Sequence, residues 1–339
     1  MRPARLPGAV ARRTLELAAT FLGLLAVTFV IGRLVPIDPA LALVGDRASA
    51  SAHAQALHEL GLDQPLWRQF LGYLGQVLQG DFGVSRLTSN PVAEDIARVF
   101  PATVELATLA TLIGVLGGVP LGVIAALRQG TWVDHAVRVA SLVGYSVPVF
   151  WFGLMGLLVF YARLDWVAGP GRLDLAYEGL VEPRSGLLLL DALLAGEWAV
   201  LVDAWRHIVL PASILGYFSM AYLARMTRAF MLEQLHQEYV LTARVKGLAE
   251  WRVVLRHALA NAAVPLVTVI ALSFGHLLEG SVLTEIVFAW PGLGSYLTQA
   301  LMSADMNAVL GGTVVIGAIF VGLNLLADVL YRWLDPRVR

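Results

Sequence analysis

The sequence contains no cysteine and only one lysine, Lys246, among its 339 residues. The lack of cysteine excludes disulfides, thiolate metal sites and cysteine nucleophiles. A Walker A loop needs a Gly-Lys pair, because its backbone amides and its lysine together cradle phosphates. Val245 precedes the lysine here, so this chain has no P-loop. Any ATP hydrolysis on which the protein depends must therefore take place on another chain.

Motifs of hydrolytic enzymes are also missing. In His-Glu-x-x-His, two zinc ligands lie one helical turn apart. The nearest match, His58-Glu59, has Leu62 in the place of the second histidine. The chain has no Gly-x-Ser-x-Gly nucleophile elbow either. We therefore predict no catalytic residue, no metal site and no cofactor bound by this chain.

Charged residues are scarce, at 14% of the chain with a net charge of −1. Nucleic-acid binding needs a clustered basic surface, and the basic residues here are spread along the sequence, so we expect no nucleic-acid partner. Apolar residues make up 58% of the chain, above the roughly 45–50% of soluble domains. This composition predicts an all-α integral membrane protein in contact with the lipid bilayer.

Long apolar runs predict six transmembrane helices, since a helix needs about 20 mostly apolar residues to cross the hydrocarbon. The predicted spans are Thr14 to Arg33, Ala102 to Leu127, Ala136 to Tyr161, His207 to Ala224, Ala263 to Phe288 and Val309 to Tyr331. The first run could instead be a cleaved signal, because Arg12 and Arg13 precede it and Ala40-Leu41-Ala42 resembles a cleavage site. Its length exceeds the usual ~7–15 residues of a signal core, which favours a span.

Basic residues orient the spans, because lysine and arginine are retained on the cytoplasmic side. They place both termini on the cytoplasmic side. The two longer segments on the opposite side, 34–101 and 162–206, are rich in acidic residues. The expected parts are a cytoplasmic N-terminus at 1–13, a first transmembrane helix at 14–33, an outer cap segment at 34–101, a five-helix core at 102–331 and a cytoplasmic tail at 332–339.

Leu187 to Val202 is a tempting seventh span. Asp191 and Glu197 interrupt it, and an aspartate near a helix centre costs about 2.5–3.5 kcal/mol in the membrane. A seventh span would also place the basic residues around Arg244 outside. We therefore predict an amphipathic helix on the outer face, lying against the membrane or capping a pore.

The cytoplasmic segment 229–262 is predicted to form two short helices separated near Gly247. Glycine permits the positive φ that ends a helix, and Arg244 and Lys246 would favour the negative end of its dipole. Beyond the glycine, helical spacing groups four apolar residues into one stripe: Leu248, Trp251, Leu255 and Leu259. Such an elbow suits docking into a groove of a partner, although an ordinary positive-inside loop fits the pattern equally well.

This segment resembles the cytoplasmic coupling loop, or EAA motif, of permease subunits of binding-protein-dependent ABC importers, in its dipeptide and oligopeptide version. The matching positions are Glu238, Tyr239, Thr242, Ala243, Arg244, Lys246, Gly247, Leu248, His257, Asn261 and Pro265. The sequence departs from the family pattern at Leu241, Val245 and Ala260, where arginine, alanine and arginine are more usual.

Shorter stretches along almost the whole chain resemble the B-type permease of these systems. They are Pro36-Ile37-Asp38-Pro39, Gly80-Asp81-Phe82-Gly83, Pro101 to Leu106, Ser146-Val147-Pro148, Phe288 to Gly294 and Asp335-Pro336-Arg337. The resemblance implies the type I permease fold of ABC importers and a place in a bacterial inner membrane. It also implies four kinds of partner: a second homologous permease, two ATPases that bind ATP and Mg²⁺, a periplasmic or lipid-anchored solute-binding protein, and a peptide substrate.

Ionisable residues within spans mark pathways or partner contacts. His276 and Glu279 are therefore candidates for a translocation pathway, with a neutral histidine bonded to a neighbouring helix as the alternative for the first. We expect Glu105, Glu279 and Glu285 to lie at the membrane interface, with a pathway role as the alternative for each. Four glycines have the small-residue spacing of closely packed helices: Gly114, Gly117, Gly118 and Gly122.

Two other functions remain open. A permease of the same family could carry nickel, opines or glutathione, because substrate choice lies largely in the solute-binding protein. An intramembrane enzyme or a stand-alone channel belongs to a different class. An enzyme should show paired polar residues on facing spans, and a secondary transporter often shows two similar halves. The sequence shows neither pattern.

Overall fold

The computed structural model describes residues 6–34, 49–59 and 61–334. Within these ranges the chain is helical, and its only extended pairing is one isolated bridge between Val84 and Pro91. The Pro36 to Pro39 stretch and Asp335-Pro336-Arg337 lie outside the described residues, as does Ala40-Leu41-Ala42.

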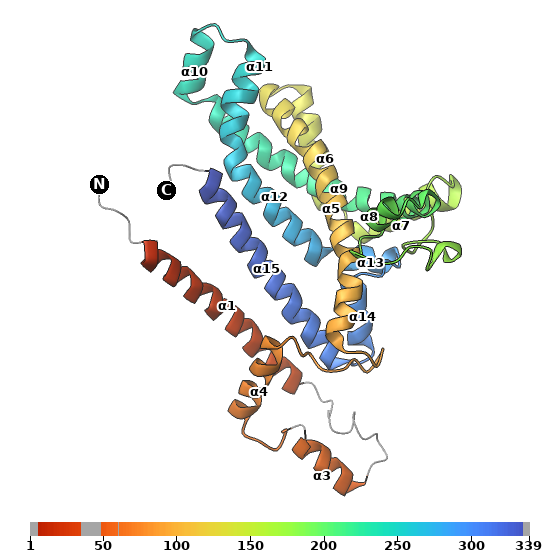
Figure 1. Ribbon diagram of the computed structural model, residues 1–339. Helices are drawn as coiled ribbons and strands as arrows, with labels where there is room; N and C mark the ends of the chain where they lie inside the picture. Colours follow the sequence, from red (N-terminus) through yellow and green to blue (C-terminus); the bar gives the residue numbers. More distant parts are fainter. Residues whose placement is uncertain (1–5, 35–48, 60, 335–339) are drawn as a thin grey trace. The chain divides into compact units, whose positions relative to one another are not determined.

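The helices follow one another along the chain as labelled in Figure 1. Their bounds are α1 Leu6–Leu34, α3 Ala50–Glu59, α4 Leu66–Leu78, α5 Val92–Leu127, α6 Trp132–Ser146, α7 Val149–Gly156, η1 Leu157–Arg163, η2 Leu175–Tyr177, α8 Leu188–Ala195, α9 Trp198–Leu235, α10 Glu238–Val245, α11 Glu250–Arg252, η3 Val253–Leu259, α12 Ala260–Gly280, α13 Val282–Val287, α14 Leu293–Met302 and α15 Met306–Leu334.

Five of the described helices are long and apolar enough to cross a membrane, and a sixth span is present if the bent pair α6 and α7–η1 counts as one. The two parts of this pair meet at 97°. The sequence predicted one continuous helix from Ala136 to Tyr161, which was wrong at this bend. A residue before proline is driven out of the helical region, and Val147, before Pro148, is extended at φ −98° and ψ 131°.

The outer helix predicted over Leu187 to Val202 is also divided. α8 ends at Gly196, which adopts a left-handed φ of 75°. Glycine is the usual residue for this conformation at a helix end. α9 then begins at Trp198, nine residues before the predicted start at His207, and continues to Leu235. The described chain therefore has a short helix, α8, followed by a long apolar one, α9, that could cross a membrane.

The chain divides into two compact units. The first comprises the described residues within Met1–Ala97 and Leu297–Val321. There, Leu25, Val77 and Val314 form a buried cluster that joins α1, α4 and α15. Asp305 is fully buried before α15, where it accepts a 2.6 Å hydrogen bond from the Ser85 hydroxyl.

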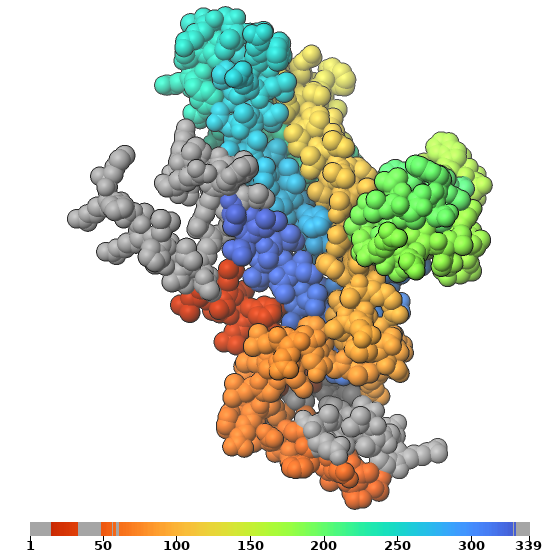
Figure 2. Space-filling model, in the orientation of Figure 1, coloured from red at the N-terminus to blue at the C-terminus, as the bar shows by residue number. Residues whose placement is uncertain are grey.

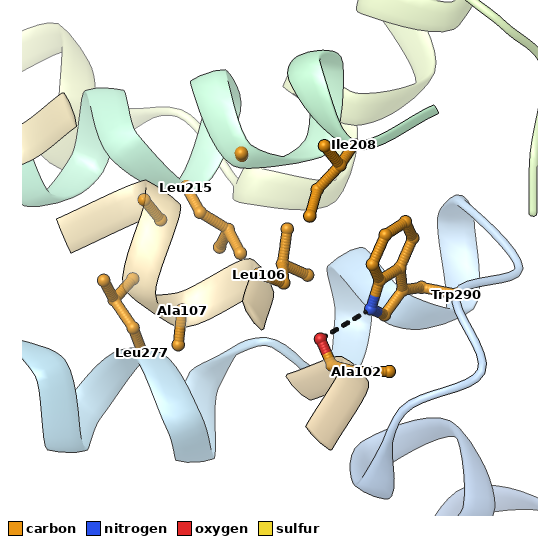
Figure 3. Packing of buried hydrophobic residues seen from close by; sticks show 9 residues of the cluster. Ala102, Leu106, Ala107, Ile208, Leu215, Leu277 and Trp290 are labelled. Carbon is orange, nitrogen blue, oxygen red and sulfur yellow. Dashed lines mark hydrogen bonds between the residues drawn. The ribbon is translucent and has the colours of Figure 1, made fainter. Parts of the chain in front are cut away.

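The second unit comprises Arg98–Tyr296 and the described residues within Gly322–Arg339. Its core lies where α5, α9 and α12 meet, and Figure 3 shows Leu106, Ile208 and Leu277 pointing toward one another from these helices. The Trp290 indole closes this core and donates a 2.9 Å hydrogen bond to the Ala102 carbonyl oxygen.

The predicted small-residue packing is present between α5 and α9. A Cβ placed on Gly118 would lie 2.7 Å from the Met220 carbonyl oxygen, and one on Gly122 would lie 2.6 Å from that of Ala224. Gly114 and Gly117 likewise face Ser219 and Met220. Because a larger side chain would collide with backbone, these glycines allow the two helices to approach closely.

Glu105 and Glu285 are buried among protein side chains, and their expected place at the membrane interface stays a prediction. Glu105 accepts hydrogen bonds from Arg172 Nη2 at 2.7 Å and from the Leu189 backbone N–H at 2.7 Å. Glu285 accepts hydrogen bonds from the Thr103 hydroxyl at 2.7 Å and from the Ser281 hydroxyl at 3.0 Å. Each glutamate therefore ties the start of α5 to segments that follow much later in the sequence.

Through Glu105, the loop between η1 and α9 is held against α5. This loop forms the green lobe in Figure 2. Within it, Asp191 accepts hydrogen bonds from the backbone N–H groups of Arg184, Ser185 and Gly186 at 3.0 to 3.2 Å. The aspartate that argued against a seventh span is thus an internal anchor of the loop between η1 and α9.

Candidate functional site

The predicted coupling segment forms a helical elbow between α9 and α12, which we define as residues 236–259. α10 leaves the end of α9, the chain turns at Gly247, and α11 and the π-helical turn η3 lead back into α12 (Figure 1). The elbow, in turquoise, forms the rounded end of this unit in Figure 2. The first short helix and the break at Gly247 lie where the sequence predicts them, whereas the second predicted short helix is the beginning of a helix that continues through α12 to Gly280.

Gly247 sets the turn through its backbone conformation. Its φ is 77°, a region that side chains with a Cβ adopt at a cost of roughly 1–2 kcal/mol. No atom lies within 4 Å of the position that a Cβ would occupy. The left-handed backbone conformation, and not a lack of space for a side chain, is therefore the reason for glycine at this position.

The inner face of the elbow is packed. Val240 and Ala243 of α10 and Val253 of η3 are buried against one another, with Leu235 and Leu248 around them. The adjoining ends of α5, α9 and α12 share a second buried cluster: Ala126, Met231, Val254, Ala258 and Ala262. Because close-packed interiors transmit displacement, the elbow and the ends of these three helices should move together.

Polar contacts fix the elbow to its stem. The Tyr239 hydroxyl donates a 2.8 Å hydrogen bond to Gln234 Oε1 of α9. Asn261 Nδ2 donates a 2.7 Å bond to the His257 carbonyl oxygen, and the Thr242 hydroxyl donates a 2.9 Å bond to the Glu238 carbonyl oxygen. Tyr239 therefore joins the elbow to α9, Asn261 joins it to α12, and Thr242 bonds to the backbone within α10.

Arg244 and Glu250 clamp the turn from its open side. Arg244 Nη2 lies 2.6 Å from Glu250 Oε1, and the hydrogen bond that it donates to this carboxylate raises the pKa of Arg244. Both side chains remain largely exposed, at 39% for Arg244 and 58% for Glu250. Glu250 does not belong to the predicted site, although its place three residues after the glycine was a signal for a charge clamp across the turn.

The exposed side of the elbow carries four apolar residues among charged ones. Leu241 and Val245 of α10 are 62% and 80% exposed, and Trp251 and Leu255 beyond the turn are 61% and 53% exposed. Each pair has the four-residue spacing that places side chains on one helix face. We call these four residues the docking face.

The docking face differs from the predicted stripe. Trp251 and Leu255 belong to both, whereas Leu248 and Leu259 pack inward with the buried clusters. Sequence reasoning treated Leu241 and Val245 only as departures from a family pattern. Their spacing of four residues was the signal that could have placed them on the exposed side of α10.

The structure brings most of the predicted motif into the elbow and separates the rest. Lys246 is exposed at the turn, and His257 is half-buried in η3. Pro265 lies inside α12, beyond the elbow. His276 and Glu279 are exposed farther along α12, and within the described part of the chain His276 has no hydrogen-bond partner on a neighbouring helix. No group of three or more potential metal ligands occurs among the described residues.

Comparisons with known proteins cover nearly the whole sequence. Residues 118–339 match the family described as "Binding-protein-dependent transport system inner membrane component", and residues 8–107 match the corresponding N-terminal family. The chain is 44% identical over 331 residues to the di/tripeptide transport system permease protein DppB of Pseudomonas aeruginosa, covering 97% of this chain and 98% of that protein.

Two Escherichia coli proteins are similar to a comparable degree. The probable D,D-dipeptide transport system permease protein DdpB is 44% identical over 318 residues, with 93% of each chain covered. The dipeptide transport system permease protein DppB is 41% identical over 334 residues, covering 97% of this chain and 98% of that one. With its apolar helices and these matches, the chain belongs to the family of inner-membrane permease components of binding-protein-dependent transport systems, as a multi-pass, all-α member.

Proposed function

We propose that this chain is a permease subunit of an ATP-driven importer that carries dipeptides or oligopeptides across the inner membrane. The observation that supports this most is the elbow, where an apolar docking face stands on a packed stem that is continuous with two long helices. Exposed apolar patches rimmed by charge mark protein interaction sites. The docking face is the surface through which a separate ATPase would hold the chain.

The ATPase is a partner in this proposal because the chain has no Gly-Lys pair with which to cradle phosphates. ATP and Mg²⁺ would be bound by two ATP-binding subunits, one on this chain and one on a second, homologous permease. A solute-binding protein would deliver the substrate to the outer face. ATP can bias the two access states only if it binds them with different affinity, and the elbow would carry that difference to α9 and α12.

A peptide substrate is supported by the names of the relatives, which describe di/tripeptide, D,D-dipeptide and dipeptide transport. Nickel, opines and glutathione have no such support among these relatives. The orientation follows from the charges: both termini and the elbow inside, and the loop that contains α8 outside.

The lack of cysteine gives a direct test of this orientation. We would introduce Lys246→Cys in the elbow and, as the matched control, Leu194→Cys in the outer loop, where both native side chains are exposed. A membrane-impermeant maleimide should label position 194 in intact cells, and position 246 only after the membrane is opened. Labelling of position 246 in intact cells would refute the proposed coupling site.

A second test addresses the ATPase. The chain should co-purify with the ATP-binding subunits encoded with it and should hydrolyse no ATP alone. Peptide uptake by vesicles containing the complete complex should require both ATP and the solute-binding protein. ATP turnover by the isolated chain, lost when that chain is mutated, would contradict the proposal.

A further inference from the structure

Two arginines lie one turn apart on α9 in different electrostatic surroundings. Arg228 forms a bidentate ion pair with Asp134 of α6, with Nε 2.6 Å from Oδ1 and Nη2 2.8 Å from Oδ2. Arg225 has no acidic partner among the described residues. Its charge is therefore left uncompensated, whereas the charge of its neighbour is neutralised.

Two tyrosines hold the Arg225 guanidinium in place. Nη2 donates a 3.1 Å hydrogen bond to the Tyr145 hydroxyl, and Cζ lies 4.5 Å from the centroid of the Tyr145 ring. The Tyr222 ring centroid lies 5.8 Å from the same carbon. Arg225 is nevertheless exposed, so the remaining guanidinium donors face outward from α6 and α9.

The guanidinium points into the span. Side chains on a helix lean toward its N-terminus, and the contact with Tyr222, one turn before Arg225, has that direction. An arginine that snorkels to the nearer interface would instead extend toward the elbow end of α9. Tyr145 lies 13 residues beyond Trp132 in α6, or about 20 Å along the helix at ~1.5 Å per residue.

Placing the charged Arg225 guanidinium against lipid costs free energy. Charged side chains within membrane-spanning segments usually face a cavity or a partner. The surface toward the outer end of α9 is aromatic. Phe152 of α7 packs edge-on against Tyr217 at 5.7 Å and Phe218 at 5.9 Å, and Trp151 packs against Phe152 at 5.7 Å. Aromatic side chains can contact apolar groups of many shapes. An arginine on the same helix can bind one anionic group.

We infer that Arg225, presented by Tyr145 and Tyr222, forms a carboxylate-binding site in the translocation pathway that receives the C-terminal carboxylate of the transported peptide. This inference rests on the proposed peptide import. Peptides differ in their side chains and share one terminal carboxylate, so a fixed guanidinium fits the group that all of them have. The planar guanidinium fork binds a carboxylate through two parallel hydrogen bonds.

The test uses the complete importer in phospholipid vesicles, with a dipeptide and its C-terminal amide, each at a concentration that saturates the solute-binding protein. For each ligand, uptake by Arg225→Gln is divided by uptake by the wild type, which cancels the preference of the binding protein. We expect this ratio to fall about 10- to 100-fold for the free acid, as for loss of charged hydrogen bonds, and less than about twofold for the amide.

Arg138→Gln is the matched control, because it removes another exposed arginine of the same unit, from α6, and it should leave both ratios near one. Arg225→Lys keeps the charge but loses the planar fork, so its uptake of the free acid should fall between that of the wild type and that of Arg225→Gln, with uptake of the amide unchanged.

An equal loss of uptake for acid and amide would overturn the inference and assign Arg225 to a contact with the second permease. If uptake of both ligands falls equally and the loss depends on the anionic-lipid content of the vesicle, the inference is also overturned, and the group bound by Arg225 is a lipid phosphate. If the wild type imports no peptide, the proposed function itself fails.

Discussion

Arg244 and Glu250 face each other across Gly247, joined by two hydrogen bonds of 2.6 and 3.2 Å. Exposed ion pairs contribute only about 0.2–1 kcal/mol to stability, and both side chains are exposed here. The bidentate geometry fixes the direction in which α11 leaves the turn. We therefore expect the pair to matter more for coupling than for folding.

The first prediction reverses this pair. Arg244→Glu should place two acids across the turn and lower ATP-dependent uptake while the free energy of unfolding changes by about 1 kcal/mol or less. The double variant Arg244→Glu/Glu250→Arg should recover most of the uptake, because it restores an ion pair across the turn with the two charges exchanged. Uptake is measured in vesicles at matched protein abundance. Failure of the double variant to exceed the single one would show that Arg244 acts on a partner and not on Glu250.

The second prediction concerns the backbone at Gly247. Gly247→Val should strain the turn, because a β-branched residue at positive φ is an outlier, and we expect a cost of roughly 1–3 kcal/mol. ATP-dependent uptake should fall while the protein still inserts into the membrane.

Gly247→Asn is the matched control, since asparagine tolerates the left-handed region far better. No neighbouring atom lies within 4 Å of either new Cβ, so the two variants differ only in backbone strain. Uptake and binding to the ATP-binding subunits should be near normal for Asn and reduced for Val. Equal loss in both variants would mean that a side chain of any kind obstructs the partner.

The local rules of helix and turn chemistry predicted the elbow well. Gly247 between two short helical patterns is a strong local signal, and the structure has the left-handed turn at this glycine. The close approach of α5 and α9 at Gly118 and Gly122 was also readable, because small residues at that spacing leave room for a facing backbone.

Features that depend on distant parts of the chain were harder to predict. Apolar composition did not show the bend at Val147-Pro148, since the two halves together are apolar enough for one span and only the proline marks the bend. The burial of Glu105 and Glu285 could not be read from the sequence, because their partners Arg172 and Thr103 are far away along the chain. Hydrophobic spacing alone could not separate Leu248, which packs inward, from Trp251, which faces outward, because Leu248 lies in the turn before α11 and does not share its helical period.

The third prediction concerns the docking face. Trp251→Ala should weaken binding of the ATP-binding subunit by about 2 kcal/mol or more, since exposed tryptophans often carry most of the energy of an interface. Leu241→Asp should weaken it further by placing a charge in an apolar contact. Co-purification of the ATP-binding subunit with the permease complex measures both. Trp198→Ala in α9 is the control, because Trp198 is 66% exposed and lies at the opposite end of that helix from the elbow. An undiminished yield of ATPase with both elbow variants would exclude this face as the contact.

The fourth prediction concerns Asp191 and pH. Burial would raise the pKa of Asp191, but hydrogen bonds from Ser185 and from three backbone N–H groups outweigh it and lower the pKa below the ordinary value of 3.8. A lowered pKa in the folded state stabilises the loop at pH values above the ordinary pKa, and this stabilisation is lost as the pH falls through the folded value. The loop between η1 and α9 should therefore keep its protection against hydrogen exchange at neutral pH and lose it only below about pH 4.

Asp191→Asn should produce the same loss at neutral pH, because the amide cannot accept all of these hydrogen bonds and presents N–H groups to other donors. Each backbone donor left without a partner costs about 1–3 kcal/mol, so amide exchange at residues 184–186 should accelerate roughly 5- to 100-fold. Hydrogen exchange of the intact complex, corrected for intrinsic rates at each pH, measures both effects. Glu182→Gln is the control, since it removes an exposed acid from the same loop. If exchange at these residues is unchanged by Asp191→Asn, the loop is held by the contact between Arg172 and Glu105, and Asp191 is not its anchor.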